Sequence, residues 1–154
     1  MGLFKKKGWI GVDLDKTLVK YTKWNNGNIG EPIPLMMDRV QAWLDQGIEV
    51  RIFTARCGNC YPDQVKKNCS AIQAFCLKHF HRLLPITNEK DQDMIALYDD
   101  RAVQMIPNTG QTLDQHLGII RDYLTTTAKS LRTMGDYSFA DSMDSFIKTY
   151  IDRK

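Results

Sequence analysis

Two carboxylates and a threonine follow an apolar run near the start of the chain. The run covers residues 8–13 and ends at Asp13, and Asp15 and Thr17 come at the next two alternate positions. Acidic side chains this close repel each other unless a cation neutralises them. Mg²⁺ suits such a pair, because it takes oxygen ligands and bridges to phosphate oxygens. Capping of the following turn by the two carboxylates is an alternative that the pattern alone leaves open.

Four short apolar segments predict the strands that position these residues. The first is too short for a core helix and has the β-branched and aromatic content of a buried strand. The others cover residues 48–53, 83–86 and 94–98. Apolar residues at helical spacing predict one helix from Pro34 to Gly47 and another from Pro62 onward. This alternation predicts an α/β domain with a mainly parallel, doubly wound, Rossmann-like sheet.

Polar residues follow three of the four predicted strands. Besides Asp13, they are Thr54, with Arg56 two positions later, and the pair Asp99-Asp100. Lys90 comes from the segment between the third and fourth strands. Ligands of such sheets bind outside the carboxyl ends of the strands, so the sequence predicts one site for a metal and a phosphate there.

These residues also carry a family resemblance. In order along the chain, Asp13-Leu14-Asp15-Lys16-Thr17, Thr54, Lys90 and Asp99-Asp100 resemble the four motifs of the haloacid dehalogenase-like phosphohydrolase superfamily. The resemblance spans residues 8–106. Phe53-Thr54-Ala55-Arg56 and Tyr98-Asp99-Asp100-Arg101 further resemble the 3′-phosphatase domains of polynucleotide kinase-phosphatases. Lys16 departs from the pattern, since many members have glycine there, yet the backbone must still turn at this residue.

The resemblance implies a role for each acidic residue. Asp13 would be the nucleophile and form an aspartyl-phosphate that water later hydrolyses. Asp15 would be the general acid for the leaving oxygen and then the base for water. Mg²⁺ would be bound by Asp13, the backbone carbonyl of Asp15, and Asp99, with Asp100 a ligand directly or through water.

A second set of residues would hold the phosphate. Positioned hydroxyls and cations stabilise a transferring phosphoryl group, and the guanidinium fork matches phosphate geometry. The expected phosphate-binding residues are Thr17, Thr54, Arg56 and Lys90. For Arg56, the alternative is an ordinary surface arginine after a strand.

The spacing of the motifs leaves no room for a cap domain. Residues 18–33 predict a small flap, a hairpin that turns at Asn26-Gly27. An uncapped site can admit a large substrate, such as the end of a nucleic acid strand or a phosphoprotein. The side chains that we expect to contact substrate are Lys16, Tyr21, Lys23, Trp24 and Arg101. For Trp24, pinning of the flap to the body of the domain is an equally open alternative.

We therefore expect a Mg²⁺-dependent phosphomonoester hydrolase that acts on a nucleic acid 3′-phosphate end or a nucleotide. One alternative is a phosphatase for small molecules, such as a 5′-nucleotidase. Another is a binding or accessory module without turnover, against which Asp15 argues, because a binder needs no proton donor.

Composition and cysteines limit the setting. With 154 residues, a net charge of +3 and 43% hydrophobic residues, the chain predicts a soluble globular protein without a membrane partner. No signal peptide pattern is visible, so we expect a reduced, cytoplasmic location. Cys69 and Cys76 lie on the apolar stripe of the second helix and predict core residues, which disfavours a zinc site. Cys57 and Cys60 form a C-x-x-C, and whether they bind metal or form a disulfide stays open.

The remainder of the chain predicts a helical extension. A turn at residues 107–110 precedes two amphipathic helices, and Ser138 and Asp141 predict a capping box for the second. We expect one domain over residues 1–154, with its core at 8–106 and the extension at 107–154. The extension either covers the sheet or forms a dimer or partner surface.

Overall fold

The computed structural model describes residues 8–23, 27–58 and 62–152 of the chain. It divides into two compact units, Met1–Ala102 and Val103–Lys154, close to the boundary expected at residue 106. Three residues that the sequence singled out, Trp24, Asn26 and Cys60, lie outside the described residues.

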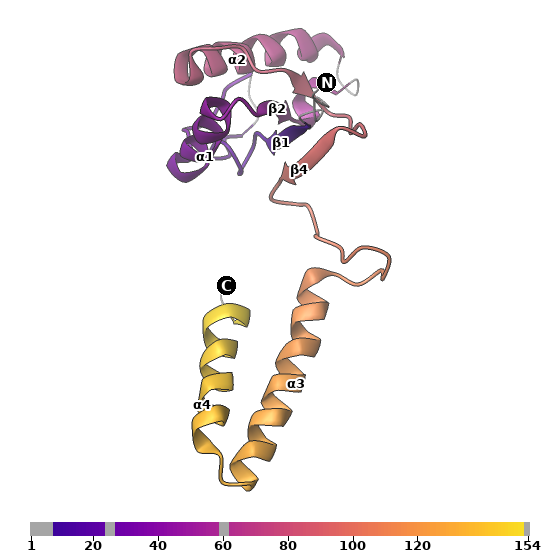
Figure 1. Ribbon diagram of the computed structural model, residues 1–154. Coiled ribbons are helices and arrows are strands. Elements are labelled where there is room, and N and C mark those ends of the chain that lie inside the picture. Colours follow the sequence, from indigo (N-terminus) through magenta and orange to yellow (C-terminus); the bar gives the residue numbers. More distant parts are fainter. Residues whose placement is uncertain (1–7, 24–26, 59–61, 153–154) are drawn as a thin grey trace, which may run out of the picture. The chain divides into compact units, whose positions relative to one another are not determined.

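The first unit contains a four-stranded sheet, and all of its strand pairs are parallel (Figure 1). The strands are β1 (Trp9–Asp13), β2 (Glu49–Phe53), β3 (Ile86–Thr87) and β4 (Met94–Tyr98). The predicted α/β class and parallel sheet are confirmed. The prediction for β3, residues 83–86, was wrong, because Pro85 has no N–H to give to a ladder and pairing begins at its carbonyl, which accepts from Ile52 N–H.

The strand order, β3-β2-β1-β4, places the carboxyl end of β1 at a topological switch point. The chain adds β2 and β3 on one side of β1 and then returns to add β4 on the other side. A crevice opens outside the carboxyl ends of the strands where the order reverses. Asp13 pairs with Phe53, and Val12 pairs with Tyr98. The residues after these partners, Thr54 and Asp99, therefore lie beside the end of β1.

Helices α1 (Pro34–Asp45) and α2 (Pro62–Phe80) share one buried core with the sheet. Gly47, with φ of 71°, follows the end of α1 as predicted. Cys76 is fully buried in the core. The same expectation for Cys69 was wrong: it is half-buried and forms a disulfide with Cys57, at the edge of the helical stripe.

The flap after β1 is an antiparallel pairing of residues 18–20 with residues 31–33, which confirms the predicted hairpin in its described part. Lys20 N–H donates to the Glu31 carbonyl at 2.8 Å. A Cβ atom at Gly30 would lie 1.8 Å from the Lys20 carbonyl oxygen, so only glycine allows this close approach.

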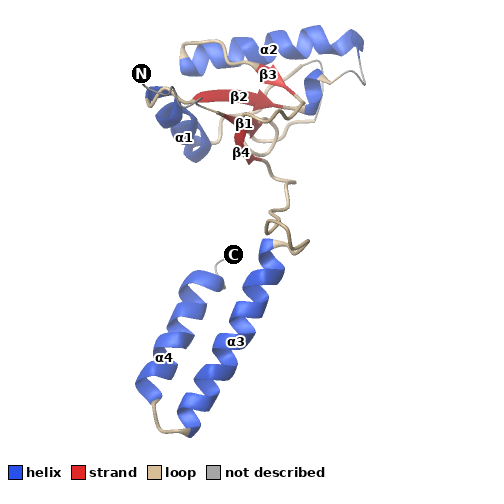
Figure 2. Cartoon of the chain, turned by 45° about the vertical axis from the view of Figure 1, so that its right-hand side comes forward, coloured by secondary structure: helices blue, strands red, loops and turns tan. Residues whose placement is uncertain are grey.

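The second unit is a helical hairpin formed by α3 (Leu113–Thr133) and α4 (Tyr137–Phe146), with a π-helical turn at Ile147–Ile151 (Figure 2). The predicted turn at residues 107–110 is present, with Ile106 N–H bonded to the Gln111 carbonyl. The capping box predicted at Ser138 was wrong. Asp136, directly after the turn at Gly135, caps α4 instead by accepting from Phe139 N–H at 3.2 Å.

Candidate active site

A pocket of about 300 Å³ opens at the carboxyl ends of β1, β2 and β4. Nine predicted site residues line it: Asp13, Asp15, Lys16, Tyr21, Thr54, Arg56, Asp99, Asp100 and Arg101. Phe53 and Ala55 complete the wall. The pocket lies at the switch point of the sheet, where the strand ends bring together residues that are far apart in sequence.

Asp13 shares this pocket with three other carboxylates, Asp15, Asp99 and Asp100. Its burial raises its pKa from 3.8 to about 6, and the negative charge of Asp99 adds to the effect. Asp15 and Asp100 raise the pKa further, whereas a hydrogen bond from Leu14 N–H opposes the shift. The site thus concentrates carboxylates around one half-buried acid, which disfavours the charged form of Asp13 in the absence of a cation.

Asp15 is held by Arg56 through two parallel hydrogen bonds. Arg56 Nε donates to Asp15 Oδ2 at 2.6 Å, and Nη2 donates to Oδ1 at 2.5 Å. The remaining terminal nitrogen, Nη1, donates to the Asn28 carbonyl in the flap at 2.8 Å. Arg56 is only 8% exposed, so its interpretation as an ordinary surface arginine was wrong. The pair joins the end of β1, the segment after β2 and the flap.

The short 3₁₀ turn η1 (Ala55–Cys57) carries Arg56. Thr54 is its N-cap: the hydroxyl accepts from Arg56 N–H at 3.2 Å and is buried. Asn68 on α2 donates its side-chain amide to the Arg56 carbonyl at 2.9 Å and is 2% exposed. Asn68 was not among the predicted site residues, although a polar residue beside the apolar stripe of a helix is a usable signal.

Lys16 turns the backbone at the rim of the pocket, with φ of 70°. The sequence required a turn at this non-glycine residue, and the structure confirms it. Lys16 Nζ lies 3.9 Å from Asp100 Oδ2 and 5.7 Å from the centre of the Tyr21 ring. Asp99 Oδ1 accepts from Arg101 N–H at 2.7 Å, which fixes the turn after β4.

Within the described ranges, three predicted site residues are not among those that line the pocket. Lys23 and Lys90 are exposed, Lys23 in the flap and Lys90 in the segment between β3 and β4. Thr17 is half-buried, and its hydroxyl oxygen is buried without a hydrogen-bond partner within the described part of the chain. An orphaned buried hydroxyl is unfavourable unless another group comes to bind it.

The donor set matches the chemistry of a hard divalent cation, although the side chains are not gathered around one point. Asp13, Asp99 and Asp100 all line the same pocket and offer carboxylate oxygens. Among the residues that the structure describes, no group of three or more histidine, cysteine, aspartate or glutamate side chains is arranged to hold a metal ion.

Comparisons with known proteins add little to the site. No protein-family model matches the chain, and no curated protein matches it. Among solved structures, the chain is similar to a conserved protein from Bacteroides thetaiotaomicron, with 19% identity over 66% of this chain and 82% of that chain and a TM-score of 0.43. None of the helices in the described ranges is both long and apolar enough to cross a membrane.

Proposed function

We propose that the chain is a Mg²⁺-dependent phosphomonoester hydrolase that works through an aspartyl-phosphate, as its resemblance to haloacid dehalogenase-like phosphohydrolases implies. The arrangement around Asp13 carries this proposal. Asp13 stands at the switch point of the sheet, in one pocket with Asp99, Asp100 and the Asp15–Arg56 pair. Packing of the fold alone gives no reason to place four carboxylates in one pocket, where the charges of Asp99, Asp15 and Asp100 raise the pKa of Asp13.

Asp13 would attack the phosphorus atom with a carboxylate oxygen, while the bond from phosphorus to the ester oxygen breaks. The new acyl phosphate would then be hydrolysed by water, which replaces one difficult displacement by two easier ones. Asp13 must be ionised to attack. Asp13, Asp99 and the backbone carbonyl of Asp15 would hold Mg²⁺, with Asp100 a ligand directly or through water, and the ion would keep Asp13 ionised and balance the negative charge of the phosphoryl oxygens.

Asp15 would donate the proton to the leaving oxygen and then take a proton from water. Arg56 bonds once to each oxygen of Asp15, and each oxygen keeps a further lone pair, so Asp15 can exchange a proton with the substrate while the pair stays formed. Arg56 therefore positions Asp15, and its remaining N–H groups can face a phosphoryl oxygen. Thr54 and the unpartnered Thr17 hydroxyl are the further phosphate-binding groups in this proposal.

The pocket favours a phosphate at the end of a larger molecule. Lys16, Tyr21 and Arg101 stand on its rim, and the Tyr21 side chain is 55% exposed. Cations beside an exposed aromatic ring suit a nucleotide, which offers phosphates and a base that stacks. We therefore propose a nucleic acid 3′-phosphate end or a nucleotide as the substrate.

Phosphate release with and without Mg²⁺, measured for the wild type and Asp13→Asn, tests this function. An oligonucleotide 3′-phosphate and a set of mononucleotides serve as substrates. We expect Mg²⁺-dependent release by the wild type, fastest on the oligonucleotide, and none by the variant. Activity that survives the substitution contradicts the aspartyl-phosphate mechanism. A preference for mononucleotides contradicts the substrate but not the reaction.

A further inference from the structure

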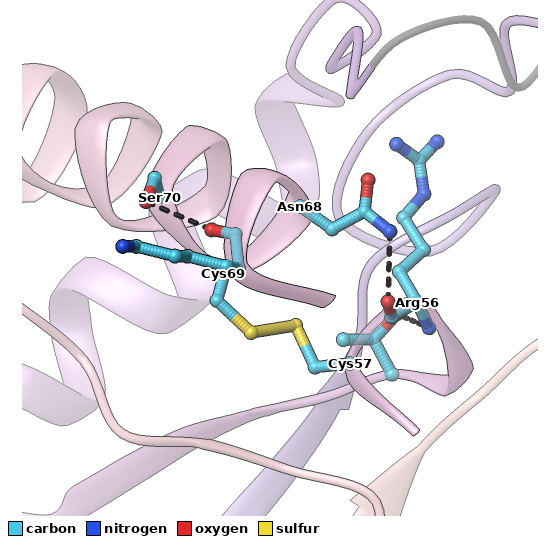
Figure 3. The surroundings of a disulfide bond; sticks show 7 residues. Arg56, Cys57, Asn68, Cys69 and Ser70 are labelled. Carbon is cyan, nitrogen blue, oxygen red and sulfur yellow. Dashed lines mark hydrogen bonds between the residues drawn. A yellow bond between two sulfur atoms is a disulfide. The ribbon is translucent and has the colours of Figure 1, made fainter. Parts of the chain in front are cut away.

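The turn that carries Arg56 is tied to helix α2 at two adjacent points. Cys57 is disulfide-bonded to Cys69, with 6.1 Å between the Cα atoms (Figure 3). Asn68, the residue before Cys69, donates to the Arg56 carbonyl at 2.9 Å. Neighbouring residues of η1 are thus held by neighbouring residues of α2. The C-x-x-C pattern left open whether Cys57 and Cys60 bind metal or form a disulfide with each other, and the structure pairs Cys57 with Cys69 instead.

This attachment leads directly to the candidate active site. In Figure 3 the Arg56 side chain extends away from the disulfide. Its guanidinium group ends on Asp15 and on the Asn28 carbonyl of the flap. Because η1 has only three residues, a shift of its backbone moves the Arg56 side chain with it. The link between Cys57 and Cys69 thus fixes the backbone of the residue next to Arg56.

Cys57 and Cys69 are less buried than Cys76, the third cysteine that the structure describes. Cys57 and Cys69 are both half-buried, so each residue keeps some exposed surface. Cys76 is 0% exposed, and its burial raises the pKa of its thiol to about 11. Since the thiolate is the reactive form, Cys76 stays inert and serves as an internal control.

We propose that Cys57 and Cys69 are a reversible thiol–disulfide modification site whose oxidation fixes Arg56 on Asp15 and raises activity, an inference that rests on the proposed phosphatase function. The oxidant is a small disulfide, such as oxidised glutathione. One cysteine thiolate attacks it, forms a mixed disulfide and releases one glutathione thiolate. The second cysteine thiolate attacks the protein-bound sulfur and releases the other. Two electrons pass to the small disulfide, and the protons of the two cysteines end on the released thiols.

The test compares the wild type in two states: oxidised with oxidised glutathione, and reduced with dithiothreitol. Mass spectrometry of peptides maps the disulfide in each state. Phosphate release is measured with Mg²⁺ on p-nitrophenyl phosphate and on an oligonucleotide 3′-phosphate. We expect the oxidised form to be about threefold or more faster, a modest part of the roughly 10²-fold that a displacement of about 1 Å can cost. Equal rates, or a faster reduced form, overturn the proposal.

Variants identify which cysteines respond and whether the effect on activity depends on Arg56. Cys69→Ser should match the reduced wild type in both states. Cys76→Ala and Cys60→Ser should keep the full response. Arg56→Lys should lose most of the response, because a lysine cannot bridge both Asp15 oxygens. A response that disappears in Cys60→Ser, or that persists in Cys69→Ser, assigns the effect to another pair and overturns the proposal.

An NMR measurement separates failure of this inference from failure of the proposed function. If neither state releases phosphate, the phosphatase proposal fails, and the Arg56 Nε–H resonance still reports its hydrogen bond to Asp15. A shift of this resonance on reduction, absent in Cys69→Ser, supports the link from the disulfide to Arg56. An unchanged resonance overturns it.

Discussion

Replacement of Asp13 by asparagine is expected to raise the free energy of unfolding of the metal-free protein at neutral pH. Burial and the neighbouring carboxylates raise the pKa of Asp13 from 3.8 to about 6, so folding disfavours its charged form. With about 1.36 kcal/mol for each pKa unit, this shift corresponds to roughly 3 kcal/mol. Asparagine has nearly the shape of the neutral acid and carries no charge, so it should recover most of this free energy.

The pH dependence of the gain has a definite sign. At low pH, Asp13 is protonated in both the folded and the unfolded state, and the charge has no effect. Between about pH 4 and pH 6 the folded state keeps a proton that the unfolded state loses, so wild-type stability falls as pH rises. Above that range both states are ionised, and the difference is constant. The gain from Asp13→Asn should be about 1 kcal/mol at pH 4.5 and about 3 kcal/mol at pH 7.5.

Urea denaturation in the presence of a chelator, followed by circular dichroism at these two pH values, measures the gain. Asp38→Asn is the matched control, because Asp38 is exposed on α1 and should change stability by less than about 0.5 kcal/mol at either pH. A variant no more stable than the wild type at pH 7.5 would refute the reasoning. So would a gain of the same size at both pH values, since the charge of Asp13 could not then be its origin.

Three further predictions follow from single contacts. In ¹³C NMR of the metal-free protein, the Asp13 carboxyl should titrate near pH 6, and Asp99→Asn should lower this midpoint, because Asp99 is the largest charge that raises the pKa. Asn68→Ala should lower the free energy of unfolding, measured in urea, by about 1–3 kcal/mol, because the buried Arg56 carbonyl loses its donor. Ser70→Ala, on the exposed side of α2, is the control and should change the free energy of unfolding by less than about 0.5 kcal/mol. Lys16→Gly should raise the urea midpoint by the equivalent of about 1 kcal/mol, because φ of 70° disfavours a residue with a Cβ atom. An unchanged midpoint would show that the lost contact between Lys16 and Asp100 offsets the relief of backbone strain.

The parts of the fold that sequence predicted well are those that depend on local pattern. The apolar runs located β1, β2 and β4 within a residue or so of their observed bounds. The carboxyl ends of parallel strands must then meet, and this rule brought Asp13, Thr54 and Asp99 into one pocket. The predicted bounds of β3 were wrong because apolar content alone does not show where strand pairing can begin. Pro85 has no N–H to donate, so pairing begins at its carbonyl and continues through Ile86 and Thr87.

The parts that sequence did not predict depend on side-chain direction. Cys69 lies at helical spacing from Cys76, so the pattern predicted two core residues. The orientation of η1 instead brings Cys57 to Cys69, which lies twelve positions further along the chain. The residue type and position of Arg56 likewise predicted a phosphate ligand. The structure shows that its guanidinium group is bonded to Asp15 and to a carbonyl of the flap, so the protein itself provides an anionic partner for Arg56.

The two carboxylates of the first motif differ in what neutralises them, and this difference is the physical basis for giving them different roles. Asp15 has a cation supplied by the chain, the buried Arg56. Asp13 forms no ion pair with any cationic side chain in the described ranges, and its neighbours raise its pKa. A divalent cation would neutralise the charge of Asp13. It would not need to bind the Asp15 side chain, whose charge Arg56 already neutralises. Replacing Arg56 would remove this asymmetry, because Asp15 would then become a second uncompensated acid beside Asp13 and compete for the same cation.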